Sequence, residues 1–147
     1  MKKLPALMMI FFVLIPSCKK KEKFAEPEYM LKKWARSIED LNYRDYASCE
    51  AYPKSEGVFI EMYREYYLRD VVITRIEDLD RKNVRKDPEG NNFHQRKVEF
   101  ECREFKRSTG APVKLIRGDV SFIRFLEGSG KKNGWLMWNR SLVRIEN

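Results

Sequence analysis

The chain has 147 residues and carries 30 lysines and arginines against 22 aspartates and glutamates, so its net charge is +8 and its isoelectric point lies near 9.4. This length fits one domain with its own hydrophobic core. One histidine, together with cysteines that lack C-x-x-C spacing, excludes an ordinary metal site. We therefore expect no metal and no other cofactor.

Residues 1–17 have the pattern of a secretory signal peptide. Lys2 and Lys3 precede an apolar run from Leu4 to Ile15. A helix that crosses a bilayer needs about 20 apolar residues, so this run is too short to span one. A buried core helix would show a polar face, which residues 6–15 lack. We expect this segment to be removed after export.

The end of that segment, Ile15-Pro16-Ser17-Cys18, resembles the lipobox of bacterial lipoproteins. In that family the peptide is cleaved just before the cysteine, which then carries fatty acyl chains. The resemblance implies that Cys18 is the lipid attachment site and that residues 18–27, which are rich in lysine, form a tether. Ile15 and Pro16 depart from the commonest lipobox residues. A conventional cleavage site, with Cys18 as an ordinary thiol, is the alternative.

Lipidation would place the protein in the cell envelope, anchored to a membrane by its N-terminus. Bacterial lipoproteins with a lysine just after the cysteine usually resemble outer-membrane residents, and Lys19 follows Cys18 here. A basic chain would ordinarily raise nucleic acid as a partner. An envelope address argues against nucleic acid and favours acidic lipid, acidic polysaccharide or another envelope protein.

Two further cysteines, Cys49 and Cys102, form an even pair that an oxidising compartment could join in a disulfide. The alternative is that both are buried free thiols that behave as small hydrophobic groups. Spacing alone does not decide between them, because a disulfide requires the two sulfurs to be in contact.

Three helices are predicted at the start of residues 28–147, which we expect to form the folded domain. Leu31, Trp34 and Ile38 belong to an amphipathic stripe over 28–41. Asp45 is the expected cap of a short helix that reaches Ala51. After Pro53, we expect Ser55 to cap a third helix. The apolar stripe of this helix consists of Phe59, Met62, Tyr63 and Tyr66.

The second half changes to the alternating period of strands. Four strands are expected, over 70–80, 93–105, 113–127 and 134–146, with turn-rich segments between them. Gly118 is a candidate bulge or bend in the third. Helices followed by an antiparallel meander indicate an α+β domain, with three helices packed on a curved four-stranded sheet.

This order resembles the NTF2-like (cystatin-like) cone fold. The segment "IEDLNYRDYASCEAY" is similar to the family's first helix, linker and second helix, and "GWLMWNRSLVRI" is similar to its closing strand. The resemblance implies a curved sheet wrapped around helices with an apolar interior. Members of the family include enzymes, transport factors and exported domains, so the resemblance does not by itself assign a function.

Few residues point to catalysis. No phosphate loop or nucleophile elbow is present, and no catalytic residue is assigned. His94 and Arg96 share the parity of Val98 in their strand and are candidates for the polar lining of the cone mouth. Glu99 and Glu101 lie about 7 Å apart on one strand face, where a solvated ion-pair ladder is favoured over paired acid catalysis.

A basic patch is predicted at one end of the sheet, because the first and third connections of a meander lie at the same end. Its members are Arg81, Lys82, Arg85, Lys86, Lys131 and Lys132. They could bind acidic lipid headgroups or sugar phosphates. Solvated loops that aid solubility are the alternative.

The sequence therefore favours a membrane-anchored envelope lipoprotein whose domain is a non-catalytic binding or interaction module. The alternative is a small cone-pocket enzyme of the isomerase or dehydratase kind. A deep polar-lined cavity would favour the enzyme, whereas a filled core would favour the module. A third hypothesis, docking of a basic domain onto acidic envelope polymers, would show steep salt dependence.

Overall fold

A computed structural model describes residues 25–79, 85–87 and 89–145. The predicted signal peptide, Cys18, most of the predicted tether, Arg81 and Lys82 lie outside these residues. The helices are α1 (Pro27–Glu39), α2 (Tyr43–Cys49) and α3 (Glu56–Tyr63), and a 3-10 turn, η1, covers Ser129–Asn133. The strands are β1 (Tyr66–Asp78), β2 (Arg85–Lys86), β3 (Asn92–Lys106), β4 (Ala111–Phe125) and β5 (Leu136–Ile145).

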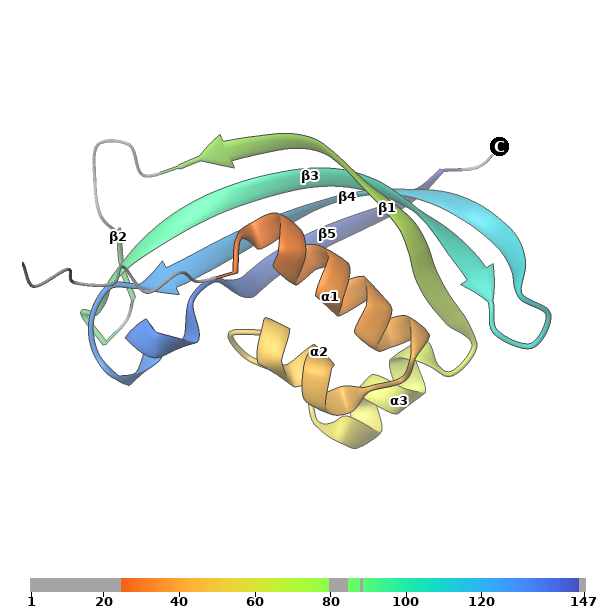
Figure 1. The fold of residues 1–147 in the computed structure, drawn as a ribbon, viewed down its shortest axis with the longest axis horizontal. Coiled ribbons are helices and arrows are strands. Elements are labelled where there is room, and N and C mark those ends of the chain that lie inside the picture. Colours follow the sequence, from red (N-terminus) through yellow and green to blue (C-terminus); the bar gives the residue numbers. More distant parts are fainter. Residues whose placement is uncertain (1–24, 80–84, 88, 146–147) are drawn as a thin grey trace, which may run out of the picture.

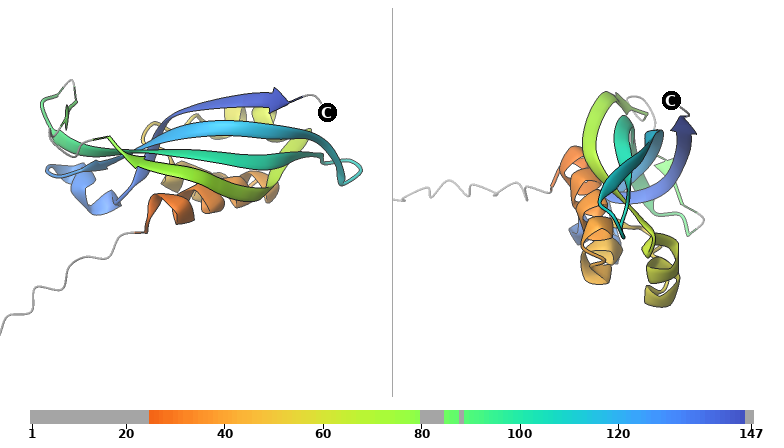
Figure 2. Two further views of the ribbon diagram at one scale, coloured as in Figure 1. Left: turned by 90° about the horizontal axis from the view of Figure 1, so that it is seen from above. Right: turned by 90° about the vertical axis from the view of Figure 1, so that its right-hand side faces the viewer.

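The domain is α+β, as predicted, with three helices before an open antiparallel sheet. The long strands lie in the order β1-β3-β4-β5, and β2 pairs with β3. The sheet curves, and α1 lies across its concave face (Figures 1 and 2). No helix in the described ranges is long and apolar enough to cross a membrane.

Three predictions about the number, bounds and caps of the elements are wrong. The sheet has five strands rather than four, because β2 is too short to show any alternation. Tyr66 begins β1 instead of continuing α3, because it pairs across the sheet with Lys106. The cap of α2 is Asn42, whose Oδ1 accepts a hydrogen bond of 3.1 Å from the Asp45 backbone N–H.

The core forms where the apolar stripe of α1 meets the concave face. Leu31, Trp34 and Ile38 are fully buried, and they pack in one cluster with sheet residues such as Val98 and Phe122. Fully burying one large aliphatic or aromatic side chain contributes about 1.5–3 kcal/mol, so this contact supplies much of the driving force for folding. The predicted alternation in β3 is confirmed.

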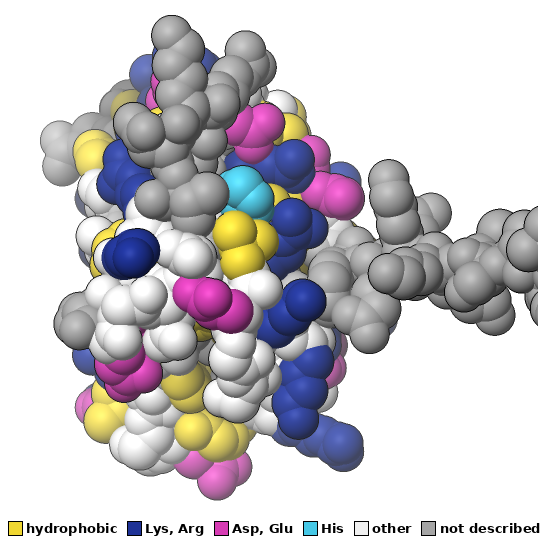
Figure 3. Space-filling view, turned by 90° about the vertical axis from the view of Figure 1, so that its left-hand side faces the viewer, with side chains coloured by type: hydrophobic (Ala, Val, Ile, Leu, Met, Phe, Trp, Pro, Cys, Tyr) yellow, Lys and Arg dark blue, Asp and Glu magenta, His cyan; other side chains and the backbone are white. Residues whose placement is uncertain are grey.

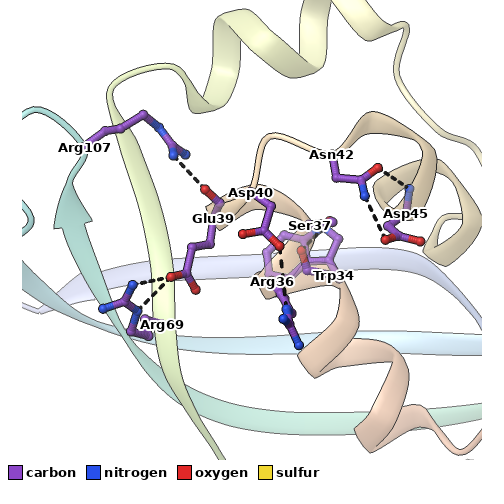
Figure 4. A network of polar contacts seen from close by, with 9 residues as sticks. All are labelled: Trp34, Arg36, Ser37, Glu39, Asp40, Asn42, Asp45, Arg69 and Arg107. Carbon is purple, nitrogen blue, oxygen red and sulfur yellow. Dashed lines mark hydrogen bonds and ion pairs between the residues drawn. The ribbon is translucent and has the colours of Figure 1, made fainter.

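Arg107, just after β3, fastens the helices to the sheet. At the end of α1, its guanidinium donates to the carbonyl oxygen of Glu39 at 2.7 Å (Figure 4). It also donates to the carbonyl oxygen of Ile38 at 2.8 Å. It also donates to the carbonyl of Tyr63, at the end of α3, at 3.3 Å. Carbonyls at the end of a helix lack partners within the helix, and a cation there also interacts favourably with the helix dipole.

Gly118 is required by a close approach rather than by a bulge. It pairs in register with Phe100 on one side and Leu142 on the other, whereas the register shifts of β4 lie elsewhere, so a bulge at Gly118 was a wrong prediction. A Cβ atom at this position would lie 2.6 Å from Cζ of Phe100 and 2.9 Å from Cδ2 of Leu142. Glycine therefore allows the Phe100 ring to lie over the strand.

Candidate functional site

His94 and Arg96 lie on the same face of β3, close to the start of α1. His94 is paired in register with Arg124 of β4. Arg96 donates from Nη1 to Glu26 at 2.7 Å and from Nε to Asp78 at 2.5 Å. Arg96 thus connects β3 with Glu26, which precedes α1, and with Asp78, which ends β1. These two carboxylates compensate its positive charge.

Trp135 fills the space beside these residues. The guanidinium carbon of Arg96 lies 4.9 Å from the centre of the Trp135 ring, and that of Arg124 lies 5.2 Å away. The indole is only 4% exposed. Cation–π contacts of this kind stabilise a partly desolvated guanidinium, and Arg96 and Arg124, which are both partly exposed, therefore form a cluster around this aromatic ring. The sequence contains no periodic signal that would have singled out Trp135 for this role.

A second polar cluster lies in the interior, where α2 meets β5. Glu50, at the end of α2, is buried, and Arg140 of β5 donates to it from Nη1 at 2.5 Å. The guanidinium carbon of Arg140 lies 5.0 Å from the centre of the Trp34 ring. Sequence reasoning missed this pair, because a single glutamate after a short helix and a single arginine in a strand carry no motif.

Burial dominates the electrostatics of this interior cluster. It raises the pKa of Glu50, although the positive charge of Arg140 acts in the opposite direction. It also raises the pKa of Tyr46 and of Tyr63, which pack beside the pair. The two tyrosines therefore remain neutral hydroxyls at physiological pH. A carboxylate, a guanidinium and two phenols could in principle serve acid–base chemistry, provided that a substrate could reach them.

Large side chains occupy the space around that cluster. Trp34, Tyr46, Phe59, Phe100 and Phe122 are each nearly or completely inaccessible to solvent. The rings of Tyr46 and Phe59 approach to 4.5 Å between centres, and Tyr63 lies 5.4 Å from Phe59. The interior between the helices and the sheet is therefore filled by large buried side chains, and the rings near α2 and α3 are in mutual contact, as in an ordinary core.

The described parts of the predicted basic patch lie at one end of the sheet. Arg85 and Lys86 form β2, and Lys131 and Lys132 belong to η1, and both elements lie at the end where α1 begins (Figure 1). All four side chains are exposed. The space-filling view of this end shows basic and acidic side chains interspersed (Figure 3).

The acidic side chains at this end line a groove of about 500 Å³. Asp87, Glu89 and Glu127 contribute carboxylates to it, and Tyr52 and Phe125 contribute aromatic rings. Hydrogen bonds from the amide of Asn91 lower the pKa of Asp87. Because these charges lie close to Lys131 and Lys132, the end of the sheet has a mixed charge rather than a purely basic one.

The outer face of the sheet carries the expected ion-pair ladder. Lys97 lies 3.8 Å from Glu99 and 3.7 Å from Asp119, and Arg117 donates to Glu101 at 2.7 Å. The two glutamates therefore have separate basic partners on an open surface. This arrangement differs from paired acid catalysis, which needs two carboxyl groups facing one substrate. Asp119 of β4 therefore lies on this outer face too.

Cys49 and Cys102 are both buried free thiols in the structure. Burial raises the pKa of Cys49 to about 11 and that of Cys102 to about 12. Neither is a thiolate at physiological pH, and only the thiolate is an effective nucleophile. Within the described residues, no group of three or more histidine, cysteine, aspartate or glutamate side chains could hold a metal ion.

Replacement of Arg140 by methionine should make the free energy of unfolding depend more strongly on pH than that of the wild type. Glu50 would lose the positive charge that opposes the effect of burial, so its pKa in the folded protein would rise further above the unfolded value of about 4.3. A raised carboxyl pKa stabilises the fold below the unfolded pKa, and this contribution is lost as the pH rises through the folded pKa. We expect Arg140→Met to cost about 3–5 kcal/mol at neutral pH and clearly less near the unfolded pKa of Glu50.

Urea denaturation across that pH range measures the effect. The Glu50→Gln, Arg140→Met double variant is the matched control, because it contains no titrating carboxyl group at this position. Its free energy of unfolding should therefore lack the pH dependence that Glu50 gives to the single variant. A pH-independent loss in the single variant would contradict the assigned coupling between Glu50 and Arg140.

Comparison with known proteins places the chain in no group. No protein-family model, no curated protein and no solved structure matches it. The inferences on function below therefore depend on the residues and geometry described above.

Proposed function

We propose that this protein is a lipid-anchored lipoprotein of the cell envelope whose α+β domain is a non-catalytic interaction module. The observation that carries the proposal is the filled interior, in which aromatic side chains occupy the concave side of the sheet. An enzyme of the cone-pocket kind needs a cavity there with a base and an anion-stabilising donor that face a substrate.

The polar groups of the concave side support the same proposal. Arg140 is paired with Glu50, Arg107 is bonded to helix-terminal carbonyls, and Arg96 is paired with Glu26 and Asp78. Polar groups that bond to one another within the chain stabilise the arrangement of helices and sheet. Few of their hydrogen-bond donors and acceptors are then free to bind a ligand. Binding would then take place on the outer surface.

The finer fold assignment is also part of the proposal. Three helices followed by a curved antiparallel sheet, with α1 across the concave face, are compatible with an NTF2-like cone. In this assignment, the domain belongs to those members whose interior is a packed core. The anchor rests on the junction Ile15-Pro16-Ser17-Cys18, and the lysines after Cys18 would lie beside an outer-membrane surface.

Two partner classes remain within this proposal. The mixed charge at the end that includes Lys86, Lys131 and Lys132 favours a protein partner over an acidic lipid or polysaccharide, because Asp87 and Glu127 lie among the basic groups. Binding to an acidic polymer would depend steeply on salt, whereas binding through a desolvated apolar contact would depend on it weakly.

The anchor is tested by Cys18→Ala. This variant should lose incorporation of labelled fatty acid, because the sulfur and the new amino group at position 18 are the expected acylation sites. It should accumulate as an uncleaved precursor or as a released protein. Metabolic labelling followed by immunoprecipitation measures both effects, with Cys49→Ala as the control that keeps Cys18 and should label normally. Unchanged labelling of the Cys18→Ala protein would exclude a lipoprotein anchor at this residue.

The module is tested with a chain that is exported by a conventional cleavable signal peptide in place of residues 1–18. Without its anchor, this protein should still sediment partly with the cell envelope. His94→Ala and Arg96→Ala should leave the sedimenting fraction unchanged, because Arg96 is bound to Glu26, Asp78 and Trp135 within the chain and His94 is only partly exposed. Joint replacement of the predicted basic patch by glutamine should reduce the fraction, most clearly at low salt.

The outcomes separate the hypotheses. Complete release of the unanchored wild-type protein at every salt concentration would contradict the interaction module. Loss of association in a folded His94→Ala protein would favour a functional pocket near that residue. Unchanged association after neutralisation of the basic patch would assign its members to solvated loops, and binding would then depend on another surface.

A further inference from the structure

Among the described residues, the sheet has two long edge strands, β1 and β5, and they differ in how well they are protected against pairing with another chain. An edge strand presents unpaired backbone N–H and C=O groups, and proteins block such edges with bulges, charged side chains or a covering element.

β1 is protected in several ways. Its pairing with β3 shifts between Arg69 and Val72 and again between Ile73 and Arg75. Asp70 has a positive φ of 57°, which interrupts the regular strand geometry. The C-terminal end of α1 approaches this strand, where the Arg69 Nε donates to the Glu39 carboxylate at 3.1 Å (Figure 4). A second strand could not pair along β1 without disrupting these features.

β5 has a regular and open edge along most of its length. From Asn139 to Ile145 it pairs with β4 without a register shift. In the described part of the chain, no backbone hydrogen bond from a loop or cap reaches residues 139–145. Trp138, Leu142 and Val143 are exposed hydrophobic residues on this strand. The stretch therefore has the properties of a strand that accepts a partner strand.

The chain itself already pairs with the beginning of this edge. Glu50 forms a parallel bridge with Met137, and the backbone N–H of Ala51 donates to the carbonyl of Met137 at 2.8 Å. The pairing of β5 with β4 shifts between Met137 and Asn139, so the contact with Glu50 and Ala51 ends at a bulge, and the regular part of the edge begins at Asn139. The next element after Glu50 and Ala51 is α3, and in the described ranges no loop or cap forms a backbone hydrogen bond with positions 139–145.

The charges of β5 suit a second copy of the same strand. Arg140 and Arg144 are its basic residues, and each is bonded within the chain, to Glu50 at 2.5 Å and to Glu104 at 2.9 Å. Antiparallel pairing of two β5 strands would therefore not bring two unpaired arginine charges close to each other. The remaining side chains of this stretch are neutral, so the edge is complementary to itself, as a two-fold interface requires.

We propose that two copies of this protein associate by antiparallel pairing of their β5 strands, which joins the two sheets into one continuous sheet across a two-fold axis. The contact uses residues 139–145 of each copy, with the exposed side chains of Leu142 and Val143 near its centre. This proposal rests on the proposed role as an interaction module, for which it names the partner at one surface.

Cysteine crosslinking of the full-length protein in intact cells tests the pairing. Val143 on β5 and Val72 on β1 are matched sites, because their exposed fractions are 59% and 60%. Val143→Cys should form a covalent species of twice the chain mass with a short bis-maleimide, in several-fold higher yield than Val72→Cys. Cys49 and Cys102 are buried in the parent protein, which serves as the background control.

A charge substitution gives an independent measurement. Val143→Lys adds a like charge to each copy at the centre of the contact, so the full-length protein in detergent should change from dimer to monomer mass in size-exclusion chromatography with light scattering. Val72→Lys, on the opposite edge, should remain a dimer. Both positions are exposed and lie outside the hydrophobic core, so neither substitution should prevent folding.

Each outcome decides the inference. A homodimer joined through position 143, confirmed by mass spectrometry of the crosslinked peptide, supports it. Equal yields for the two cysteine variants, or crosslinking of Val143→Cys to a different protein, would overturn it. The inference would also be overturned if the folded Val143→Cys protein stayed monomeric although its introduced cysteine reacted with a monofunctional maleimide, which shows that the thiol is accessible. If the dimer is absent but the protein still associates with the envelope, the β5 pairing is rejected and the interaction module is not. If the dimer forms but the protein does not associate with the envelope, only the module is rejected.

Discussion

The packing of α1 against the concave face of the sheet determines the rest of this structure. Trp34 and Leu31 of α1 and Phe122 of β4 are all fully buried, and they belong to one core that the helix and the sheet share. Arg107 holds the end of α1 through two backbone carbonyls. Without α1 in this position, the curved sheet would expose a continuous apolar surface, which a small domain cannot tolerate in water.

The filled interior also explains how the polar groups are arranged. Arg140 and Glu50 meet inside the core, where each charge would be costly without the other. Arg96 and Arg124 flank Trp135 at the end where α1 begins. These groups connect elements that would otherwise meet only through apolar contacts. The surface of the domain, rather than its interior, is then the place where recognition of other molecules is expected, and the β5 edge is its most regular unpaired feature.

The order of the elements could be predicted because period and turn residues are local properties. The alternation of Val98 and Phe100 with charged neighbours was sufficient to identify β3 and its buried face. Contacts between distant residues could not be predicted in this way. Glu50 and Arg140 lie 90 positions apart, and no spacing rule relates them. Tyr66 was placed in a helix because its local stripe is helical, whereas cross-strand pairing decides its conformation.

The central claim is that α1 fills the concave side as a core element and does not line a substrate cavity. The free energy of unfolding of Trp34→Ala, compared with that of the wild type by urea denaturation, tests this claim most directly. Because Trp34 is fully buried among other core residues, the account predicts a loss of about 3–5 kcal/mol. Residues that line functional cavities are often not optimised for stability. An unchanged or increased stability of Trp34→Ala would contradict the claim and would favour a pocket at this position.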